Sequence, residues 1–195
     1  MTLILIPAAT EWPSLLWGQS AYRISAEAAE RGARKLQSLE KFSTEGKAGT
    51  KQTTRFTEEE VNSYLAFNLN TTYHPSLKKL VLTFNENSVT VAASIDFDRL
   101  GEISSEMMSR LISLIFSGTR TLTAEGQIIS GQGKAHFNLK QARLDDRTIP
   151  NYLVNEIIAL VGKTRNPPFD PMNPSELPHK IKSIALHSGF VIVHQ

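Results

Sequence analysis

Apolar and polar residues alternate in three stretches of the chain, and a short turn divides each stretch. The stretches cover residues 80–97, 122–139 and 181–193, with turns at residues 85–87, 130–133 and 188–189. Because alternation puts the apolar side chains on one face of a strand, each stretch predicts a hairpin with one buried face. Short turns make paired strands antiparallel, so the pattern predicts a mainly antiparallel sheet of about six strands.

The alternation slips once, in the returning strand of the second hairpin. Leu139 lies in one phase, whereas Ala142 and Leu144 lie in the other. One extra residue in a strand returns the side chains that follow it to the original face of the sheet, and it also bends the strand. We therefore expect a β-bulge near Lys140-Gln141 and a curved sheet.

Four further segments repeat their apolar residues every three or four positions, which is typical of helices. They are residues 20–41, 57–69, 102–116 and 150–161. In chain order the elements read as two helices, a hairpin, a helix, a hairpin, a helix and a hairpin. This order predicts an α+β fold whose curved sheet wraps around helices, with residues 20–195 as one domain that begins with N-terminal helices.

The clearest start signal for a helix lies at residues 56–61. Thr57 is placed to cap the helix, and Glu60 follows three positions later, which completes a capping box. Phe56 and Val61 occupy the two positions of a hydrophobic staple around that cap.

A proline-rich connection precedes the third hairpin. Four prolines lie between Pro167 and Pro174. Each proline fixes its own φ angle and disfavours helix at the residue before it. We expect a stiff, extended connection on the surface.

Two predicted helices have unusually wide apolar faces. At about 100° per residue, the apolar positions of residues 102–116 cover roughly 220°, and those of residues 150–161 cover roughly 160°. A helix that lies on a sheet needs an apolar stripe only somewhat wider than about 100°. The helix with the wider apolar face is either fully buried in the core or has an additional apolar neighbour. That neighbour is an oily ligand in a groove, a membrane or a second subunit.

The first nineteen residues are also apolar. Glu11 is their only charged residue, and Trp12 and Trp17 are side chains that suit a membrane interface. Two prolines interrupt the run, and no basic region opens it. Residues 1–19 are interpreted as an apolar arm or as the remnant of a membrane anchor, with a membrane surface as a possible partner.

Composition narrows the classes of function. The formal net charge is only +2, which is too mild for a nucleic-acid-binding protein. The chain has no cysteine, so a disulfide framework, a thiol nucleophile and a cysteine-based metal site are excluded. Its five histidines lack metal-ligand spacing, and no nucleophile elbow, P-loop or dinucleotide fingerprint occurs. We expect no enzymatic activity, no cofactor and no metal.

Several short motifs, in order, resemble a family. The helix start at residues 57–65 matches the pattern T-E-x-E-x-N-x-Y-L, and Gly131-x-Gly133 precedes Phe137. Arg143-Leu144, Ile149-Pro150 and Leu153-Val154 follow, and the chain ends with Leu177-Pro178, Gly189 and Val191-Ile192-Val193. Together these motifs, spread over residues 55–195, resemble the YpmS-like and LmeA-like bacterial extracytoplasmic proteins, which are related to tubular lipid-binding (TULIP) folds.

The resemblance implies a curved antiparallel sheet around helices, a pocket for an acyl chain, and a location outside the cytoplasm, in the periplasm or anchored to a membrane. It supplies no catalytic residues. We therefore expect a non-enzymatic protein that binds a lipid or another apolar ligand in a groove between helix and curved sheet. The alternative is an interaction module that docks on a protein through an apolar helix face. The predicted ligand-binding residues are Leu80, Leu82, Phe84, Val91, Ile95, Met107, Leu111, Ile115, Phe137, Leu139 and Ile157.

Overall fold

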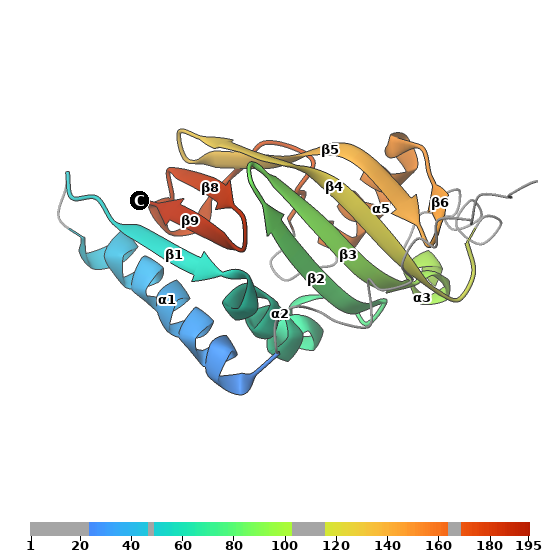
Figure 1. Ribbon diagram of the computed structural model, residues 1–195, viewed down its shortest axis with the longest axis horizontal. Helices are drawn as coiled ribbons and strands as arrows, with labels where there is room; N and C mark the ends of the chain where they lie inside the picture. Colours follow the sequence, from blue (N-terminus) through green and yellow to red (C-terminus); the bar gives the residue numbers. More distant parts are fainter. Residues whose placement is uncertain (1–23, 47–48, 103–115, 164–168) are drawn as a thin grey trace, which may run out of the picture.

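The computed structural model describes residues 24–46, 49–102, 116–163 and 169–195. These residues form an α+β fold with two antiparallel sheets that lie side by side (Figure 1). The predicted fold class is confirmed. The N-terminal arm, residues 1–19, lies outside the described residues.

The larger sheet has six strands and contains the first two predicted hairpins. Its strands are β2 (Leu77–Asn85), β3 (Ser88–Asp96), β4 (Thr119–Gly131), β5 (Lys134–Leu144), β6 (Arg147–Thr148) and β7 (Ser175–Glu176). The first five strands follow one another in the order β2-β3-β4-β5-β6, and β7 pairs with the far end of β5. This order leaves β2 at one edge of the sheet.

The third predicted hairpin belongs to a separate sheet. It forms β8 (Ser183–His187) and β9 (Phe190–His194), and β9 also pairs with β1 (Thr53–Thr57). The sequence pattern did not predict β1, because its apolar signal is limited to Phe56. The six predicted strands are therefore divided between two sheets.

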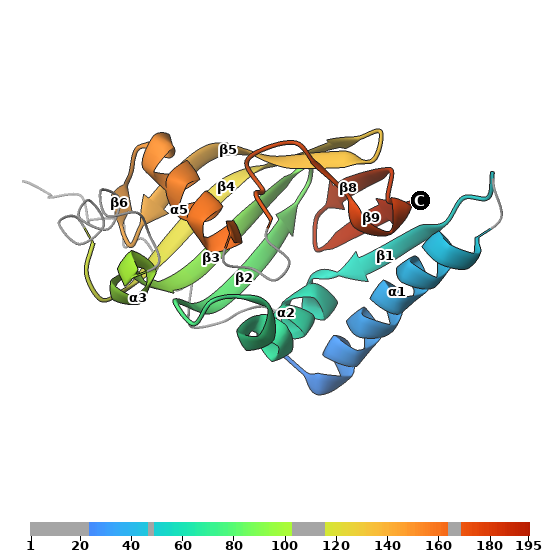
Figure 2. The same cartoon turned by 180° about the vertical axis from the view of Figure 1, so that it is seen from behind.

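The helices cover different parts of the two sheets. They are α1 (Ala26–Glu45), α2 (Glu58–Thr72), α3 (Phe97–Glu102) and α5 (Asn151–Lys163), with a short 3-10 helix η1 (Pro178–Lys180). The first two lie beside β1 and β2, whereas α5 lies across one face of the larger sheet (Figures 1 and 2). Residues 103–115, the main part of the helix with the widest predicted apolar face, lie outside the described residues.

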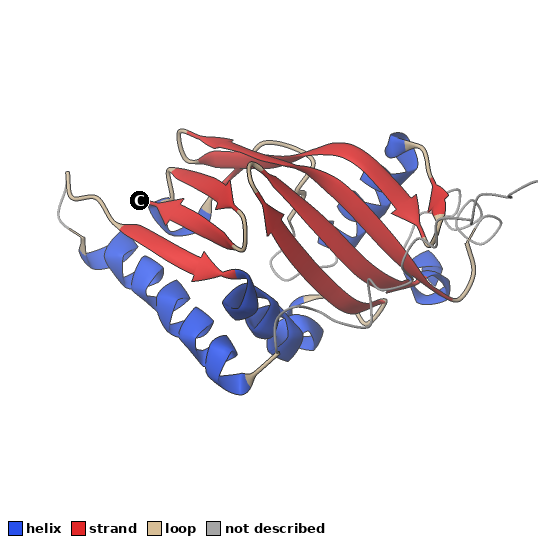
Figure 3. Ribbon diagram, viewed as in Figure 1, coloured by secondary structure: helices blue, strands red, loops and turns tan. Residues whose placement is uncertain are grey.

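The predicted β-bulge is confirmed in β5. Glu125 of β4 faces Gln141, and the next residue, Gly126, faces Leu139, so Lys140 is the extra residue. Because of the bulge, Ala142 and Leu144 face the same side of the sheet as Leu139, although simple alternation would put them on the other side. The long strands β4 and β5 curve in the ribbon views (Figure 3).

The predicted capping box is confirmed at the start of α2. The backbone N–H of Glu60 donates to Oγ1 of Thr57 over 3.2 Å, and the backbone N–H of Thr57 donates to Oε2 of Glu60 over 2.9 Å. Two backbone N–H groups that the helix itself cannot satisfy are thus paired.

The buried apolar residues form two clusters, and the second also includes Phe84 and Val89 of the larger sheet. The first joins the larger sheet to α3 and α5 around Ile95, Phe97 and Val154. The second joins the smaller sheet to α1 around Leu39, Phe56 and Val193. Phe137 packs against both clusters, so the two parts of the core meet at this residue.

Candidate functional site

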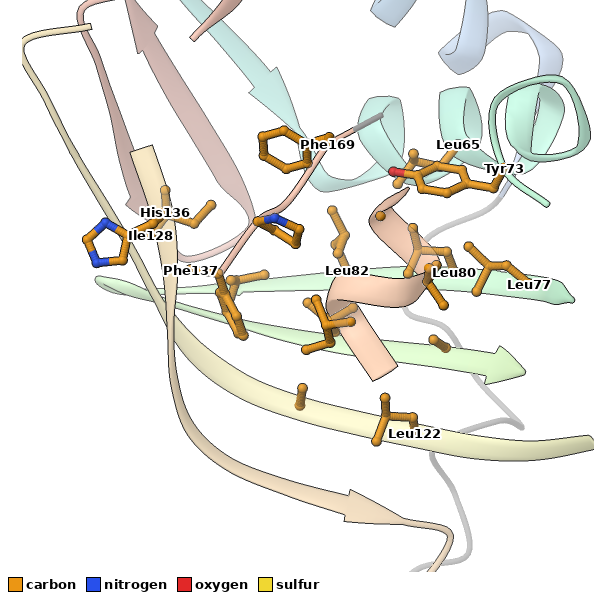
Figure 4. Close-up of a pocket in the computed structure, with 18 of the residues that line it drawn as sticks. Leu65, Tyr73, Leu77, Leu80, Leu82, Leu122, Ile128, His136, Phe137 and Phe169 are labelled. Carbon is orange, nitrogen blue, oxygen red and sulfur yellow. The ribbon is translucent and has the colours of Figure 1, made fainter. Parts of the chain in front are cut away.

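A cavity of about 380 Å³ lies between the larger sheet and α5. Its floor consists of inward-facing residues of β2, β3, β4 and β5, whose register puts Leu82, Val91 and Ala124 on one face of the sheet. Ile157 and Ile158 of α5 contribute from the other side. We call this space the first cavity; Figure 4 shows its lining.

Seven of the eleven residues predicted to bind ligand line the first cavity. They are Leu80, Leu82, Phe84, Val91, Ile95, Phe137 and Ile157. Leu139 packs against the adjoining core and is absent from the lining. Met107, Leu111 and Ile115 lie outside the described residues.

The prediction missed part of the lining for two different reasons. Leu122, Ala124 and Ile128 share the strand phase of the predicted residues, so alternation alone could have identified them. Ile184 and Phe169 come from the smaller sheet and from the proline-rich connection. No local pattern shows that these two segments reach the cavity.

The proline-rich connection is a wall of the cavity. Of the predicted connection, residues 169–174 form neither helix nor strand, as predicted, and Pro167 and Pro168 lie outside the described residues. The backbone N–H of Phe169 donates to the carbonyl of Gly162 over 3.0 Å, and the backbone N–H of Phe137 donates to the carbonyl of Pro171 over 2.7 Å. A Cβ atom at Gly162 would collide with the carbonyl oxygen of Phe169, so glycine lets this wall approach α5.

A second glycine shapes the floor. A Cβ atom at Gly126 would collide with the backbone of Asn138 and with the ring of Phe137. The ring of Phe137 therefore occupies the space beside Gly126 that a side chain would otherwise fill. The absence of a side chain at this position lets Phe137 pack against β4.

The described lining of the first cavity contains almost no polar side chains. Its polar side chains are Tyr73 and His136. His136 lies between two inward-facing residues of β5, so its side chain points to the opposite face of the sheet, and its ring is directed away from the cavity in Figure 4. The Tyr73 hydroxyl points toward the middle of the cavity in that view. It is the one side-chain polar group that the described lining directs inward.

A second, larger cavity of about 640 Å³ lies between α1, α2 and the smaller sheet. Its lining includes Leu36, Leu39 and Val193, but also Glu60 and His179. Five residues line both cavities: Leu65, Leu82, Phe84, Ile128 and Ile184. We call these five residues the shared wall.

Glu60 is a buried carboxylate with three basic or N–H partners. Nζ of Lys35 lies 2.6 Å from its Oε2, Nε of Arg31 lies 3.5 Å from its Oε1, and the Thr57 N–H also donates to it. Burial alone would raise the pKa of Glu60. The hydrogen bonds from Lys35 and Thr57 and the charges of Lys35 and Arg31 outweigh burial, so the pKa is lowered. Glu60 is therefore a charged, satisfied structural group.

The shared wall is fixed to α2 by side chains that bind the free edge of β2. Nδ2 of Asn62 donates to the carbonyl of Leu82 over 2.7 Å, and Oδ1 of Asn62 accepts from the Leu82 N–H over 2.8 Å. Oε2 of Glu58 accepts from the Phe84 N–H over 2.6 Å. Burial raises the pKa of Glu58, and the bond from Phe84 offsets this only in part. These contacts satisfy backbone groups that would otherwise leave an open strand edge.

A single hydroxyl does the same for the free edge of β8. Oγ of Ser130, on β4, donates to the carbonyl of Ile184 over 2.9 Å and accepts from the Ile184 N–H over 2.8 Å. Leu82 and Ile184 are thus both held through their backbones, and their apolar side chains are left to face the cavities.

No group of three or more histidine, aspartate or glutamate side chains among the described residues could hold a metal ion. No helix in the described ranges has both the length and the apolar character needed to cross a bilayer.

A scan against protein-family models finds no match to the chain, and a search of curated proteins finds no matching sequence. A function is therefore inferred from the geometry of the two cavities.

Proposed function

We propose that this protein binds a lipid or a similar apolar molecule in the first cavity and carries out no chemistry on it. The observation that supports this proposal is a cavity of about 380 Å³ whose described lining directs only the Tyr73 hydroxyl inward. Its volume lies in the range of about 300–1,000 Å³ that is typical of small-molecule sites.

The composition of the lining favours a hydrocarbon chain over a polar ligand. A polar group buried without a hydrogen-bond partner costs roughly 1–3 kcal/mol, and the cavity offers almost no partners. Each buried methylene, by contrast, contributes about 0.8 kcal/mol of favourable transfer free energy. One hydroxyl beside an apolar space suits a molecule with one polar end and one apolar end.

The family and the location are part of the same proposal. The resemblance to YpmS-like and LmeA-like proteins agrees with an apolar cavity against a curved antiparallel sheet. A location outside the cytoplasm is proposed on that resemblance alone. The interaction-module alternative depended on the helix predicted at residues 102–116, most of which lies outside the described residues, so no observation favours it.

Fluorescence titration with cis-parinaric acid tests the proposal, with two neighbouring alanines of β3 as a matched pair. Ala93 faces the first cavity, and Ala92 faces the opposite side of the sheet. We expect the wild-type chain and Ala92→Phe to bind the probe, and Ala93→Phe to raise the Kd by about tenfold or more.

Circular dichroism and a thermal melt must show that Ala93→Phe is folded. If it does not fold, Ala124→Leu fills the same cavity with less added volume. Absence of probe binding by the wild-type chain, or equal binding by both phenylalanine variants, would refute the proposed site.

A further inference from the structure

The two cavities share one wall, and this wall is built in an unusual way. Leu82 and Ile184 come from the free edges of two different sheets, and each has its backbone N–H and carbonyl bound by one side chain of another element. No backbone ladder crosses the wall at these two positions. What separates the cavities there is apolar side chains on a fixed frame.

From this arrangement we infer that the second cavity continues the binding site of the first, so that the protein selects long, unbranched hydrocarbon chains. This inference rests on the proposed function. A chain longer than the first cavity passes between the side chains of the shared wall and ends beneath α1. Rotation of staggered side chains such as Leu65 and Ile128 opens this path without breaking a hydrogen bond.

The composition of the second cavity fits the end of a chain and not a charged headgroup. Leu36, Leu39 and Val193 line it, and its buried carboxylate, Glu60, is already paired with Lys35 and Arg31. A second anionic group there would share the cavity with the Glu60 carboxylate, whose basic partners Lys35 and Arg31 are already engaged. The end that enters the second cavity is therefore the apolar one.

A series of fatty acids tests the inference by competition against cis-parinaric acid. Octanoic, lauric, palmitic and arachidic acids are each used below their aggregation concentration. If the chain continues into the second cavity, affinity rises roughly two- to fourfold for each added methylene, even beyond the length that fills the first cavity.

Ala33→Phe fills the second cavity from α1 without touching the first. We expect this variant to bind octanoic acid as the wild-type chain does, but to lose the gain in affinity for palmitic and arachidic acids. Ala26→Phe makes the same change at an exposed position of α1 and should keep the wild-type profile. If Ala33→Phe does not fold, Leu36→Trp narrows the same cavity one turn away.

The outcomes separate the two proposals. If wild type and Ala33→Phe show the same dependence on chain length, the first cavity alone holds the ligand, and the further inference is wrong while the proposed function stands. If the wild-type chain binds neither cis-parinaric acid nor any acid of the series, both proposals fail.

Discussion

The two cavities lie on either side of one wall but differ in what surrounds them. Strands and α5 enclose the first cavity, and the described side chains that point into it are apolar except for Tyr73. The second cavity is enclosed by α1, α2 and the smaller sheet, and its lining includes Glu60, which forms an ion pair with Lys35. The described lining of the first cavity thus directs no charged side chain inward, whereas the lining of the second cavity includes a charged carboxylate.

The difference follows from the elements. A strand that faces a cavity presents every second residue, so a regular alternation yields an unbroken apolar floor. The start of a helix has unpaired N–H groups, and α2 satisfies one of them with the carboxylate of Glu60. That carboxylate lies beside the second cavity because the capping box does. Charge in the second cavity is therefore a consequence of how α2 begins.

The largest expected effect comes from breaking the wall that both cavities share. Asn62→Ala removes both side-chain hydrogen bonds to the backbone of Leu82, at a position of α2 that is almost fully buried. We expect the free energy of unfolding to fall by about 2–4 kcal/mol in urea denaturation. Asn62→Asp keeps the acceptor for the Leu82 N–H but puts a carboxylate against the Leu82 carbonyl at a buried position, so it should lose at least as much. A loss within error for Asn62→Ala would show that the wall does not depend on this side chain.

The next largest effect is expected at Glu60, the charged residue that lines the second cavity. Glu60→Gln weakens the interaction with Lys35, which is about one-third exposed, and should lower stability at neutral pH by about 1–2 kcal/mol. Because the pKa of Glu60 is lowered in the folded protein, its contribution is present above the ordinary glutamate pKa of about 4.3 and is lost as the pH falls through the folded value.

Glu58 provides the opposite control in the same helix. Its pKa is raised, so its contribution is complete below the ordinary glutamate pKa and is lost as the pH rises through the folded value. In urea titrations from about pH 4 to about pH 7, Glu60→Gln should flatten a rise in stability with pH, and Glu58→Gln should flatten a fall. Identical pH profiles for the two variants would contradict this assignment.

A smaller effect is expected at the cap itself. Thr57→Ala removes the hydroxyl that accepts from the Glu60 N–H and should cost about 1 kcal/mol of stability. Thr57→Ser keeps the hydroxyl and should remain close to wild type. An unchanged denaturation midpoint for the alanine variant would mean that the hydroxyl contributes nothing to α2.

The smallest effect sharpens the description of the first cavity. Tyr73→Phe removes the hydroxyl that points into the cavity and keeps the ring. One hydrogen bond to the polar end of a fatty acid contributes about 0.5–1.5 kcal/mol, so we expect the Kd for palmitic acid to rise by roughly two- to tenfold. The methyl ester of palmitic acid should lose less. Tighter binding of the acid by Tyr73→Phe would show that its polar end lies elsewhere.

Local signals predicted the parts of the fold that depend on neighbouring residues. The slip in phase between Leu139 and Ala142 located the bulge, because side-chain facing in a strand has a period of two. The sequence at Thr57 and Glu60 located the start of α2, because a capping box is a local set of hydrogen bonds. For the same reason, alternation along β2 and β3 placed Leu82 and Val91 in the lining.

Long-range contacts could not be predicted in this way. The smaller sheet exists because β1 pairs with β9, more than a hundred positions away along the chain, and only Phe56 marks β1 as apolar. The wall at Phe169 depends on the hydrogen bond from its N–H to the carbonyl of Gly162. It also depends on the absence of a side chain at Gly162, which lets the two segments approach each other. In the sequence, Asn62 looks like an ordinary polar residue of a helix. No neighbouring residue indicates that it binds the edge of β2.

Methyl chemical shifts in nuclear magnetic resonance test the central claim most directly. The chain is labelled at its isoleucine, leucine and valine methyl groups and saturated with palmitic acid. We predict shifts for Ile95, Ile157 and Leu80, which line the first cavity, and none for Ile129, which lies exposed on the outer face of β4. Shifts confined to exposed methyl groups such as that of Ile129, with the three cavity residues unchanged, would contradict the claim that the first cavity is the binding site.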